Sequence, residues 1–172
     1  HRADRQEEAH DDDDQVAAAY GRQLPRSDAG VAEAHARLFN YPPDSRVKAL
    51  ADAEELGIKT PFLSNSFAAY RVAALREVGG FPQKTLFGED MYVAAKLLLA
   101  GYRIAYVADA TVWHSHSYSL GAEFRRYFDI GVFHARNPWL HERFGGAGSE
   151  GLRYVRSELT YAVSQAPFVI PS

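Results

Sequence analysis

The stretch LFGEDMYVAAKLLLAGY, residues 86–102, decides how the chain folds. Two adjacent carboxylates, Glu89 and Asp90, precede an apolar run in which Lys96 alone is charged. Such a run predicts a mostly buried helix, and Gly101 is typical of the residue that follows a helix C-terminus. Two explanations of the acids stay open: they complement the helix dipole, or one of them is a general base facing a cleft.

The flanking sequence predicts a chain in which helices outnumber strands. Apolar runs bounded by Gly and Pro predict strands in residues 15–25, 61–71 and 103–116. The first run is ended by Gly21 and Pro25, and the last predicts one or two strands with a turn near Asp109. Apolar periodicity predicts helices in residues 28–43, 46–57, 72–81, 120–144 and 148–167. Three or four strands are few beside the roughly five or more of a usual sheet, so the sheet is expected to be incomplete.

Composition describes a globular domain and excludes several classes of protein. The 172 residues are 47% hydrophobic and contain no run near the roughly 20 apolar residues that span a bilayer. Cysteine is absent, so any metal must be held by His, Asp, Glu or water. The N-terminal HRADRQEEAH lacks the apolar core of a secretory signal, which favours a cytoplasmic location.

Charge is concentrated at one end of the chain. Residues 1–15 are acidic and without apolar periodicity, which predicts a disordered lead-in. The run DDDD at 11–14 does not follow a buried strand, so we interpret it as a solvated acidic tail rather than a metal site. The net charge is −3 and the remainder of the chain is mildly basic, far from the dense basic stripe of a nucleic-acid binder.

Two histidines follow the acids in the sequence VWHSHS. His114 and His116 are two residues apart, so in a strand both would point to the same face. They could approach one metal ion together, or they could be a pair of partly buried, hydrogen-bonded side chains. Two histidines do not complete a metal site, so further ligands would be required.

Glycines and polar residues surround the acidic pair. Gly79 and Gly80 allow close approach of the backbone to a ligand, although a turn is their commoner use, and Gly88 directly precedes the acids. Asn65 lies in the polar loop SNSF, which suits hydrogen bonding to a sugar and equally suits a turn.

Adjacent arginines occur in the predicted helix 120–144. Either Arg125 or Arg126 could bind a phosphate through two parallel hydrogen bonds while the other is solvated. A solvated helix face is the ordinary location of each arginine taken singly.

Together these motifs resemble a known family. The chain resembles the C-terminal half of an inverting glycosyltransferase of family 2, in its rhamnosyltransferase-like branch. The runs that carry the resemblance are YGRQLP, FNYP, SNSFAAYR, EVGGFP, GEDMYVAAKLLLAGYRIAYVADATVWHSHSYSL and FRRYFDIGVFHA. The resemblance covers residues 16 to about 170. It implies an α/β chain with the acceptor-side half of a Rossmann-like GT-A fold in residues 16–118, and a helical extension in residues 119–172.

The resemblance also implies roles for the residues named above. The family's x-Glu-Asp motif falls on Gly88, Glu89 and Asp90, with Asp90 as the catalytic base. His114 best matches the family's metal-contacting histidine, with His116 second.

Two pairs of residues match the family more loosely. Gly79 and Gly80 match a loop beside the acceptor, and Arg125 and Arg126 match arginines near the donor diphosphate or the acceptor.

The implied ligands follow from the same resemblance. They are a nucleotide-sugar donor such as dTDP-rhamnose, a cell-surface glycan acceptor and a divalent cation, Mn²⁺ or Mg²⁺. A lipid-linked acceptor would bring the protein to the inner face of the membrane by peripheral association, and no nucleic acid is implied.

One large part of the family pattern has no counterpart here. The nucleotide-binding half, about 100 residues comparable to a mononucleotide-binding unit, is not matched by residues 1–15. The expectation is therefore a fragment that holds the base and the acceptor side. The alternatives are a catalytically inactive remnant or docking module and, less favoured, a metal-dependent hydrolase.

Overall fold

The computed structural model of the chain describes residues 15–85, 87–115, 120–146 and 150–165. Its strands are β1 (Val16–Leu24), β2 (Arg46–Lys48), β3 (Ala68–Tyr70) and β4 (Arg103–Trp113). Its α-helices are α2 (Val31–Asn40), α3 (Ala53–Leu56), α4 (Val72–Glu77), α5 (Glu89–Leu99), α6 (Leu120–Arg136), α7 (Trp139–Phe144) and α8 (Glu150–Gln165). Short 3₁₀ turns are η1 (Leu50–Asp52), η2 (Gly57–Lys59) and η3 (Asn65–Phe67). Residues 1–14, most of the predicted acidic lead-in, lie outside the described residues.

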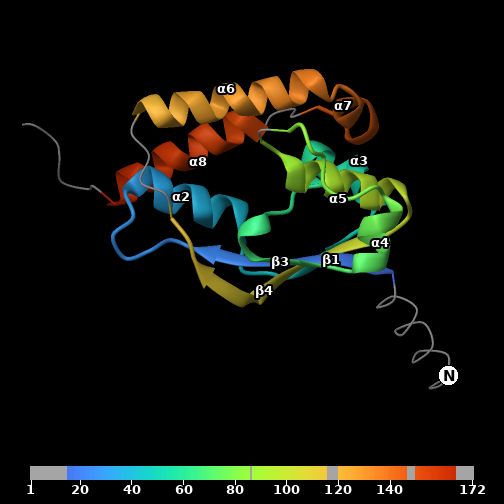
Figure 1. Cartoon of the computed structure of the whole chain (residues 1–172). Helices are drawn as coiled ribbons and strands as arrows, with labels where there is room; N and C mark the ends of the chain where they lie inside the picture. Colours follow the sequence, from blue (N-terminus) through green and yellow to red (C-terminus); the bar gives the residue numbers. More distant parts are fainter. Residues whose placement is uncertain (1–14, 86, 116–119, 147–149, 166–172) are drawn as a thin grey trace, which may run out of the picture.

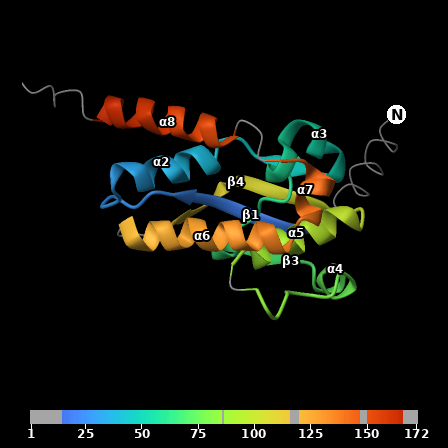
Figure 2. The same ribbon diagram turned by 90° about the horizontal axis from the view of Figure 1, so that it is seen from above.

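The strands form one mixed sheet in the order β2-β4-β1-β3. The two long central strands are parallel, with Tyr20 opposite Tyr106, and the short strands β2 and β3 pair antiparallel at the two edges. Helices α2 and α5 lie over the sheet, and α6 and α8 lie farther out on the same side (Figure 1). The view from above places α6 and α8 on either side of β1 (Figure 2).

The central strand pair corrects two predictions. Strand β1 continues through Gly21 to Leu24, and residues 103–113 form one strand without a turn. A register shift lies where the turn was predicted, because Gly21 pairs with Val107 while the next residue of β1 pairs with Thr111. A Cβ on Gly21 would lie 2.5 Å from the carbonyl oxygen of Ala110, so only glycine fits this close approach.

The segment 46–57 was predicted as one helix, and this prediction is wrong for its first residues. Arg46 to Lys48 pair with β4 as a strand, and only then does the chain turn through η1 into the four-residue helix α3. The carboxylate of Asp52 accepts a hydrogen bond from the backbone N–H of Ala49 and is ion-paired with Arg46. These two contacts of Asp52 therefore fix a turn that closes back on the strand.

The predicted helix 120–144 is two helices. Helix α6 ends at Arg136 and α7 begins at Trp139, because Pro138 has no backbone N–H with which to continue the helical hydrogen bonds. Asn137 closes α6, since its side-chain amide donates to the carbonyl of Phe133. The helices predicted in 28–43, 72–81 and 148–167 are confirmed, as α2, α4 and α8.

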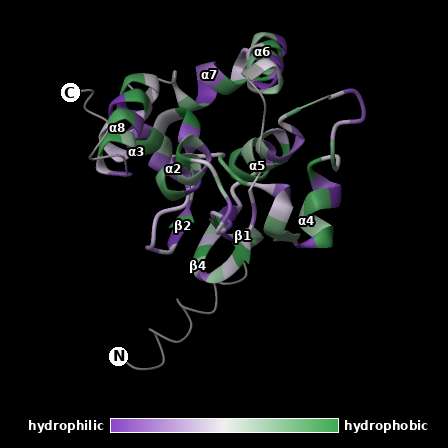
Figure 3. Ribbon diagram, turned by 90° about the vertical axis from the view of Figure 1, so that its left-hand side faces the viewer, coloured by the Kyte–Doolittle hydropathy of each residue, from purple (hydrophilic) through white to green (hydrophobic). Residues whose placement is uncertain are grey.

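Helix α5 supplies the centre of the core. Its residues Val93, Ala94, Ala95, Leu97 and Leu98 are 0% exposed. They pack with residues of β1, β4 and α7 in one apolar cluster. Figure 3 shows the hydrophobic colouring of α5 in the interior of the molecule, as its sequence predicts.

Truncating this core should be costly. We expect Leu97→Ala to lower the free energy of unfolding by about 2–5 kcal/mol, because the fully buried side chain leaves a cavity. Lys96→Ala, on the exposed face of the same helix, is the matched control and should change the free energy of unfolding by about 0.5 kcal/mol or less. Chemical denaturation measures both, and equal losses would show that α5 is not packed as described.

Candidate active site

A pocket of about 380 Å³ lies at the N-terminus of α5. Its walls come from α2, α5, α6, the end of β1 and the loop that precedes β3. Among its lining residues are Asp90, His114 and Arg126, three of the side chains that the sequence singles out. Residues far apart in the sequence therefore meet in one cavity, as a binding site requires.

Asp90 is held by backbone groups at the start of α5. Its Oδ1 accepts a hydrogen bond from the N–H of Met91 at 2.8 Å, and its Oδ2 accepts one from the N–H of Asn65 at 3.3 Å. The first bond belongs to the helix N-terminus, and the second joins α5 to the loop before β3. The carboxylate is thus fixed in direction while it lines the pocket.

The pKa of Asp90 is raised above its ordinary value. Burial is the largest cause and the charge of Glu89 adds to it, while the hydrogen bonds from Met91 and Asn65 act in the opposite direction. Burial therefore outweighs the stabilisation that these hydrogen bonds give to the ionised carboxylate. A carboxylate with a raised pKa is a stronger base once it is ionised.

Asn65 links the two acids to β3. Its side-chain amide donates to Glu89 Oε1 at 3.5 Å, and its Oδ1 accepts a hydrogen bond from the Tyr70 hydroxyl at 2.6 Å. Burial and the charges of Asp90 and Glu89 raise the pKa of Tyr70, so this hydroxyl remains a donor. In this structure Asn65 contacts both carboxylates, but it is not among the residues that line the pocket, and its predicted place beside a sugar stays a prediction.

His114 lies one residue beyond the end of β4. Its backbone N–H donates to Leu24 O at 3.0 Å, and its Nε2 lies 3.3 Å from Ser66 Oγ. The prediction that it belongs to a strand is wrong by one residue, since β4 ends at Trp113. His116 lies outside the described residues, so the shared orientation of the two histidines stays a prediction.

The described residues do not assemble a metal site by themselves. Within 15–85, 87–115, 120–146 and 150–165, no three His, Cys, Asp or Glu side chains are grouped so that they could hold a metal ion. His114 is the only imidazole of the predicted pair that the structure places at the pocket. This donor set does not fit a divalent cation without further ligands.

Positive charge enters the pocket from two helices. Arg126 of α6 lines it, as one of the two predicted arginines, whereas Arg125 is exposed and is not among the lining residues. Arg37 of α2 and His134 of α6 also line it and were not identified from the sequence. Nothing in their local sequence marks them, because only the packing of α2 and α6 around α5 brings them there.

His134 is a distinct part of this wall. Its ring lies 4.8 Å from that of His141, and its Nδ1 is buried with no hydrogen-bond partner in the described structure. Burial and the neighbouring His141 lower the pKa of His134, which favours the neutral imidazole. A ligand polar atom could satisfy this nitrogen only after a small movement of the ring, because the nitrogen is not exposed.

A buried relay supports the loop that holds Asp90. Arg37 Nη1 donates to Gln23 Oε1 at 2.8 Å, and Gln23 Nε2 donates to Ser64 Oγ at 2.8 Å. Gln23 is almost fully buried, so these bonds are worth more than equivalent bonds at the surface. The relay thus fixes residue 64 directly before Asn65.

The glycine pair lies outside this pocket. Gly79 and Gly80 follow α4 with positive φ values of 90° and 70°, which makes them turn residues. They are not among the residues that line the pocket, and their predicted role beside the acceptor stays a prediction.

Comparison with known proteins identifies the family. The profile described as glycosyl transferase family group 2 matches residues 7–127, more than half of the chain. This chain belongs to the glycosyl transferase family group 2. The mixed sheet and the helices of this family 2 chain agree with a partial GT-A domain, so the predicted fold class is confirmed.

Relatives of this glycosyl transferase family 2 chain include two O-antigen chain rhamnosyltransferases and a pre-mycofactocin glycosyltransferase. It is 56% identical over 156 residues to the O-antigen chain rhamnosyltransferase RfbN of Salmonella typhimurium, covering 91% of this chain and 50% of RfbN. It is 54% identical over 159 residues to the O-antigen chain rhamnosyltransferase WbaN of Salmonella anatum, covering 92% of this chain and 50% of WbaN. A pre-mycofactocin glycosyltransferase of Mycobacterium tuberculosis is 35% identical over 83 residues, 43% of this chain and 18% of its own length. The chain spans about half the length of the two rhamnosyltransferases.

None of the helices in the described part of the chain is both long and apolar enough to cross a membrane.

The turn at Gly88 should tolerate no side chain. Gly88 has φ +77°, and a Cβ there would lie 2.9 Å from the ring of Phe133. Gly101 has φ +90° with open space around it, so Gly101→Ala is the matched control for backbone strain alone. We expect Gly88→Ala to destabilise the protein by about 1–3 kcal/mol more than Gly101→Ala, measured by chemical denaturation. Equal losses would show that Phe133 does not close this side of the pocket.

The raised pKa of Asp90 should be visible as a stability effect. Because folding raises this pKa, the side chain favours the folded state when protonated, and this contribution is lost as pH rises through the raised pKa. Asp90→Asn removes the ionisation. We therefore expect a higher Tm than wild type at pH 7, and a difference that disappears as pH falls below about 4.

A surface aspartate provides the comparison for this experiment. Asp44→Asn makes the same chemical change at an exposed position and should leave Tm nearly unchanged. A lower Tm for Asp90→Asn at pH 7 would mean that the two backbone hydrogen bonds outweigh burial.

Proposed function

We propose that this chain carries the acceptor side and the catalytic base of an inverting glycosyltransferase, with Asp90 as the base. The observation that carries the proposal is the position of Asp90, which lines a pocket of about 380 Å³ with its carboxylate fixed by Asn65 and Met91. Burial and Glu89 raise its pKa, as suits a general base.

The proposed step is a single displacement. Asp90 removes the proton of an acceptor hydroxyl, and the hydroxyl oxygen attacks the anomeric carbon of the donor sugar. The bond between that carbon and the leaving diphosphate oxygen breaks on the opposite face, which inverts the configuration. Arg37 and Arg126, which line the same pocket, supply positive charge for an anionic group of donor or acceptor.

The substrates are proposed from the relatives. The two Salmonella relatives are O-antigen chain rhamnosyltransferases, and half of each is matched by this chain. We infer a nucleotide-activated rhamnose such as dTDP-rhamnose as donor and a growing surface glycan as acceptor. If that glycan is lipid-linked, the protein works in the cytoplasm at the inner face of the membrane.

A divalent cation is part of the proposal but not of the derived step. Family 2 enzymes generally use Mn²⁺ or Mg²⁺, which would neutralise the leaving diphosphate when bound. His114, with His116, is proposed to contact that ion. The other ligands would come from the donor phosphates or from residues outside those described, because the described ones do not complete a ligand set.

The base assignment can be tested in the full-length enzyme. We expect Asp90→Asn to lower kcat by about 10²- to 10⁴-fold, because the lost group acts in proton transfer. The donor Kd, measured by calorimetry, should stay nearly unchanged.

Glu89→Gln is the matched control. Glu89 contacts Asn65 through a long hydrogen bond of 3.5 Å. Replacing Glu89 should therefore lower kcat far less than replacing Asp90 does. Near-normal turnover in Asp90→Asn, or equal losses in the two variants, would place the base elsewhere.

A further inference from the structure

A lysine on the β2 side of the molecule is buried without a counter-ion. Lys48 is 4% exposed, and in the described part of the chain it forms no ion pair. Its Nζ donates to the carbonyl of Phe62 and lies 5.1 Å and 5.9 Å from the ring centres of Tyr20 and Phe62. Nothing in the proposed transfer reaction uses this amine.

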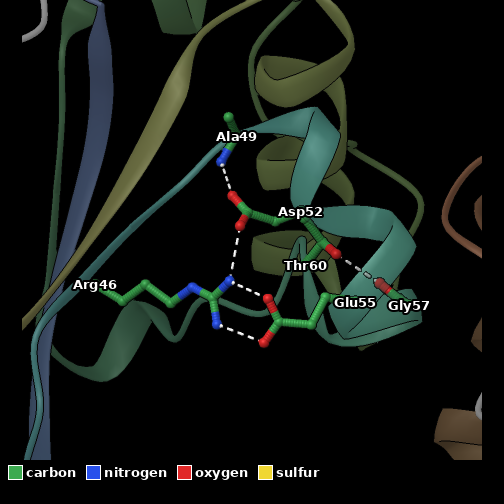
Figure 4. A network of polar contacts seen from close by, with 6 residues as sticks. All are labelled: Arg46, Ala49, Asp52, Glu55, Gly57 and Thr60. Carbon is green, nitrogen blue, oxygen red and sulfur yellow. Dashed lines mark hydrogen bonds and ion pairs between the residues drawn. The ribbon is translucent and has the colours of Figure 1, made fainter.

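The carboxylates of Asp52 and Glu55 are both paired with Arg46. Arg46 Nη2 lies 2.7 Å from Asp52 Oδ1 and 2.9 Å from Glu55 Oε2, and its Nη1 donates to Glu55 Oε1 at 3.1 Å (Figure 4). Asp52 also accepts the N–H of Ala49 at 2.7 Å, so both of its oxygens are occupied. The two carboxylates are therefore paired with Arg46 and not with Lys48, which leaves its ammonium form poorly stabilised.

The environment therefore favours the neutral amine. Burial, and secondly the charge of Arg46, lower the pKa of Lys48 to about 7, while Asp52 acts weakly in the opposite direction. A large share of the molecules carries a free amine at neutral pH, and a free amine is the nucleophilic form.

Lys48 lines a second cavity. A pocket of about 640 Å³ is lined by Lys48 and by the aromatic rings of Tyr20, Phe39, Phe62 and Tyr106. The other charged residues that line it are Asp44, Arg46, Glu55, Lys59 and Arg153. Arg46 is paired with Glu55 and Asp52, and the two further cations of the lining, Lys59 and Arg153, outnumber Asp44, which favours a ligand with an anionic group. None of the described lining residues is a histidine, the side chain that ordinarily titrates near neutral pH.

We propose that Lys48 is the nucleophilic amine of a second binding site, which captures a small aldehyde carrying an anionic group as a reversible imine. The amine nitrogen attacks the aldehyde carbon, and a C=N bond replaces the C=O bond. Both amine protons leave with the carbonyl oxygen as water, and hydrolysis reverses the step. No oxidant, metal or further co-reactant is needed.

The site is separate from the candidate active site but shares two wall residues with it. Asn40 and Phe62 line both pockets, and Phe62 also accepts the hydrogen bond of Lys48 Nζ. An imine at Lys48 gives up that hydrogen bond and thus alters a wall of the pocket that contains Asp90. The proposal does not rest on the transfer reaction, because the amine chemistry can be measured without donor or acceptor.

Glyoxylate, a small anionic aldehyde, is the probe for the test. The full-length protein is incubated with glyoxylate and a borohydride reductant, and adducts at Lys48, Lys59, Lys84 and Lys96, the four lysines of this chain, are quantified by peptide mass mapping. At pH 7 we expect labelling of Lys48 to be at least about tenfold faster than that of the others, since its neutral fraction is on the order of 10³ larger than that of an ordinary lysine.

The pH profile and a second aldehyde complete the test. Labelling of Lys48 should level off above about pH 7, whereas ordinary lysines should keep gaining reactivity up to pH 9. Acetaldehyde, which has no anionic group, should label Lys48 more slowly than glyoxylate does. Three results would each overturn the proposal: equal labelling of the four lysines, a Lys48 pH profile that rises like those of the other lysines, or equal labelling rates with the two aldehydes. All three are measured on the unaltered protein, so the test does not depend on the folding of a variant.

Discussion

The burial of helix α5 is the constraint on which the rest of the structure depends. Its apolar face is closed between the sheet and the helices above it, so the helix has only one position in which its body avoids water. The N-terminus of the helix, with Glu89 and Asp90, is then fixed at the edge of the core. Phe133 of α6 covers the turn at Gly88 and leaves no room for a side chain there.

The candidate site is built from a conflict between burial and charge. Asp90 is placed where burial raises its pKa, and two backbone N–H groups partly compensate for that cost. The loop that supplies one of those groups is itself held by the relay from Arg37 through Gln23 to Ser64. A carboxylate kept in place at some cost to stability is the pattern expected of a residue retained for chemistry.

A second conflict of the same kind occurs at Lys48. Arg46 is ion-paired with Asp52 and Glu55, whereas Lys48 is buried beside aromatic rings without such a pair in the described part of the chain. The two unusual ionisable groups lie in adjacent pockets that share Asn40 and Phe62. One fold thus holds a carboxylate of raised pKa and an amine of lowered pKa on two sides of the same wall.

The sequence by itself determined the elements whose signals are local. The apolar run of α5, the glycine before it and the acids at its start were all readable, because helix periodicity and capping act over a few residues. Predictions failed where a local pattern has two solutions. The apolar spacing of residues 46–57 predicted one helix, and only the pairing of β2 with β4 makes the start of this segment a strand followed by a turn.

Tertiary structure alone decided the composition of the pocket. Arg37 and His134 reach it because α2 and α6 pack around α5, and no short-range pattern reports that packing. The sequence does not reveal that the amine of Lys48 is buried and has a lowered pKa. Its burial depends on contacts from β1 and from the loop before β3. Local order follows from neighbours along the chain, whereas burial and charge environment follow from neighbours in space.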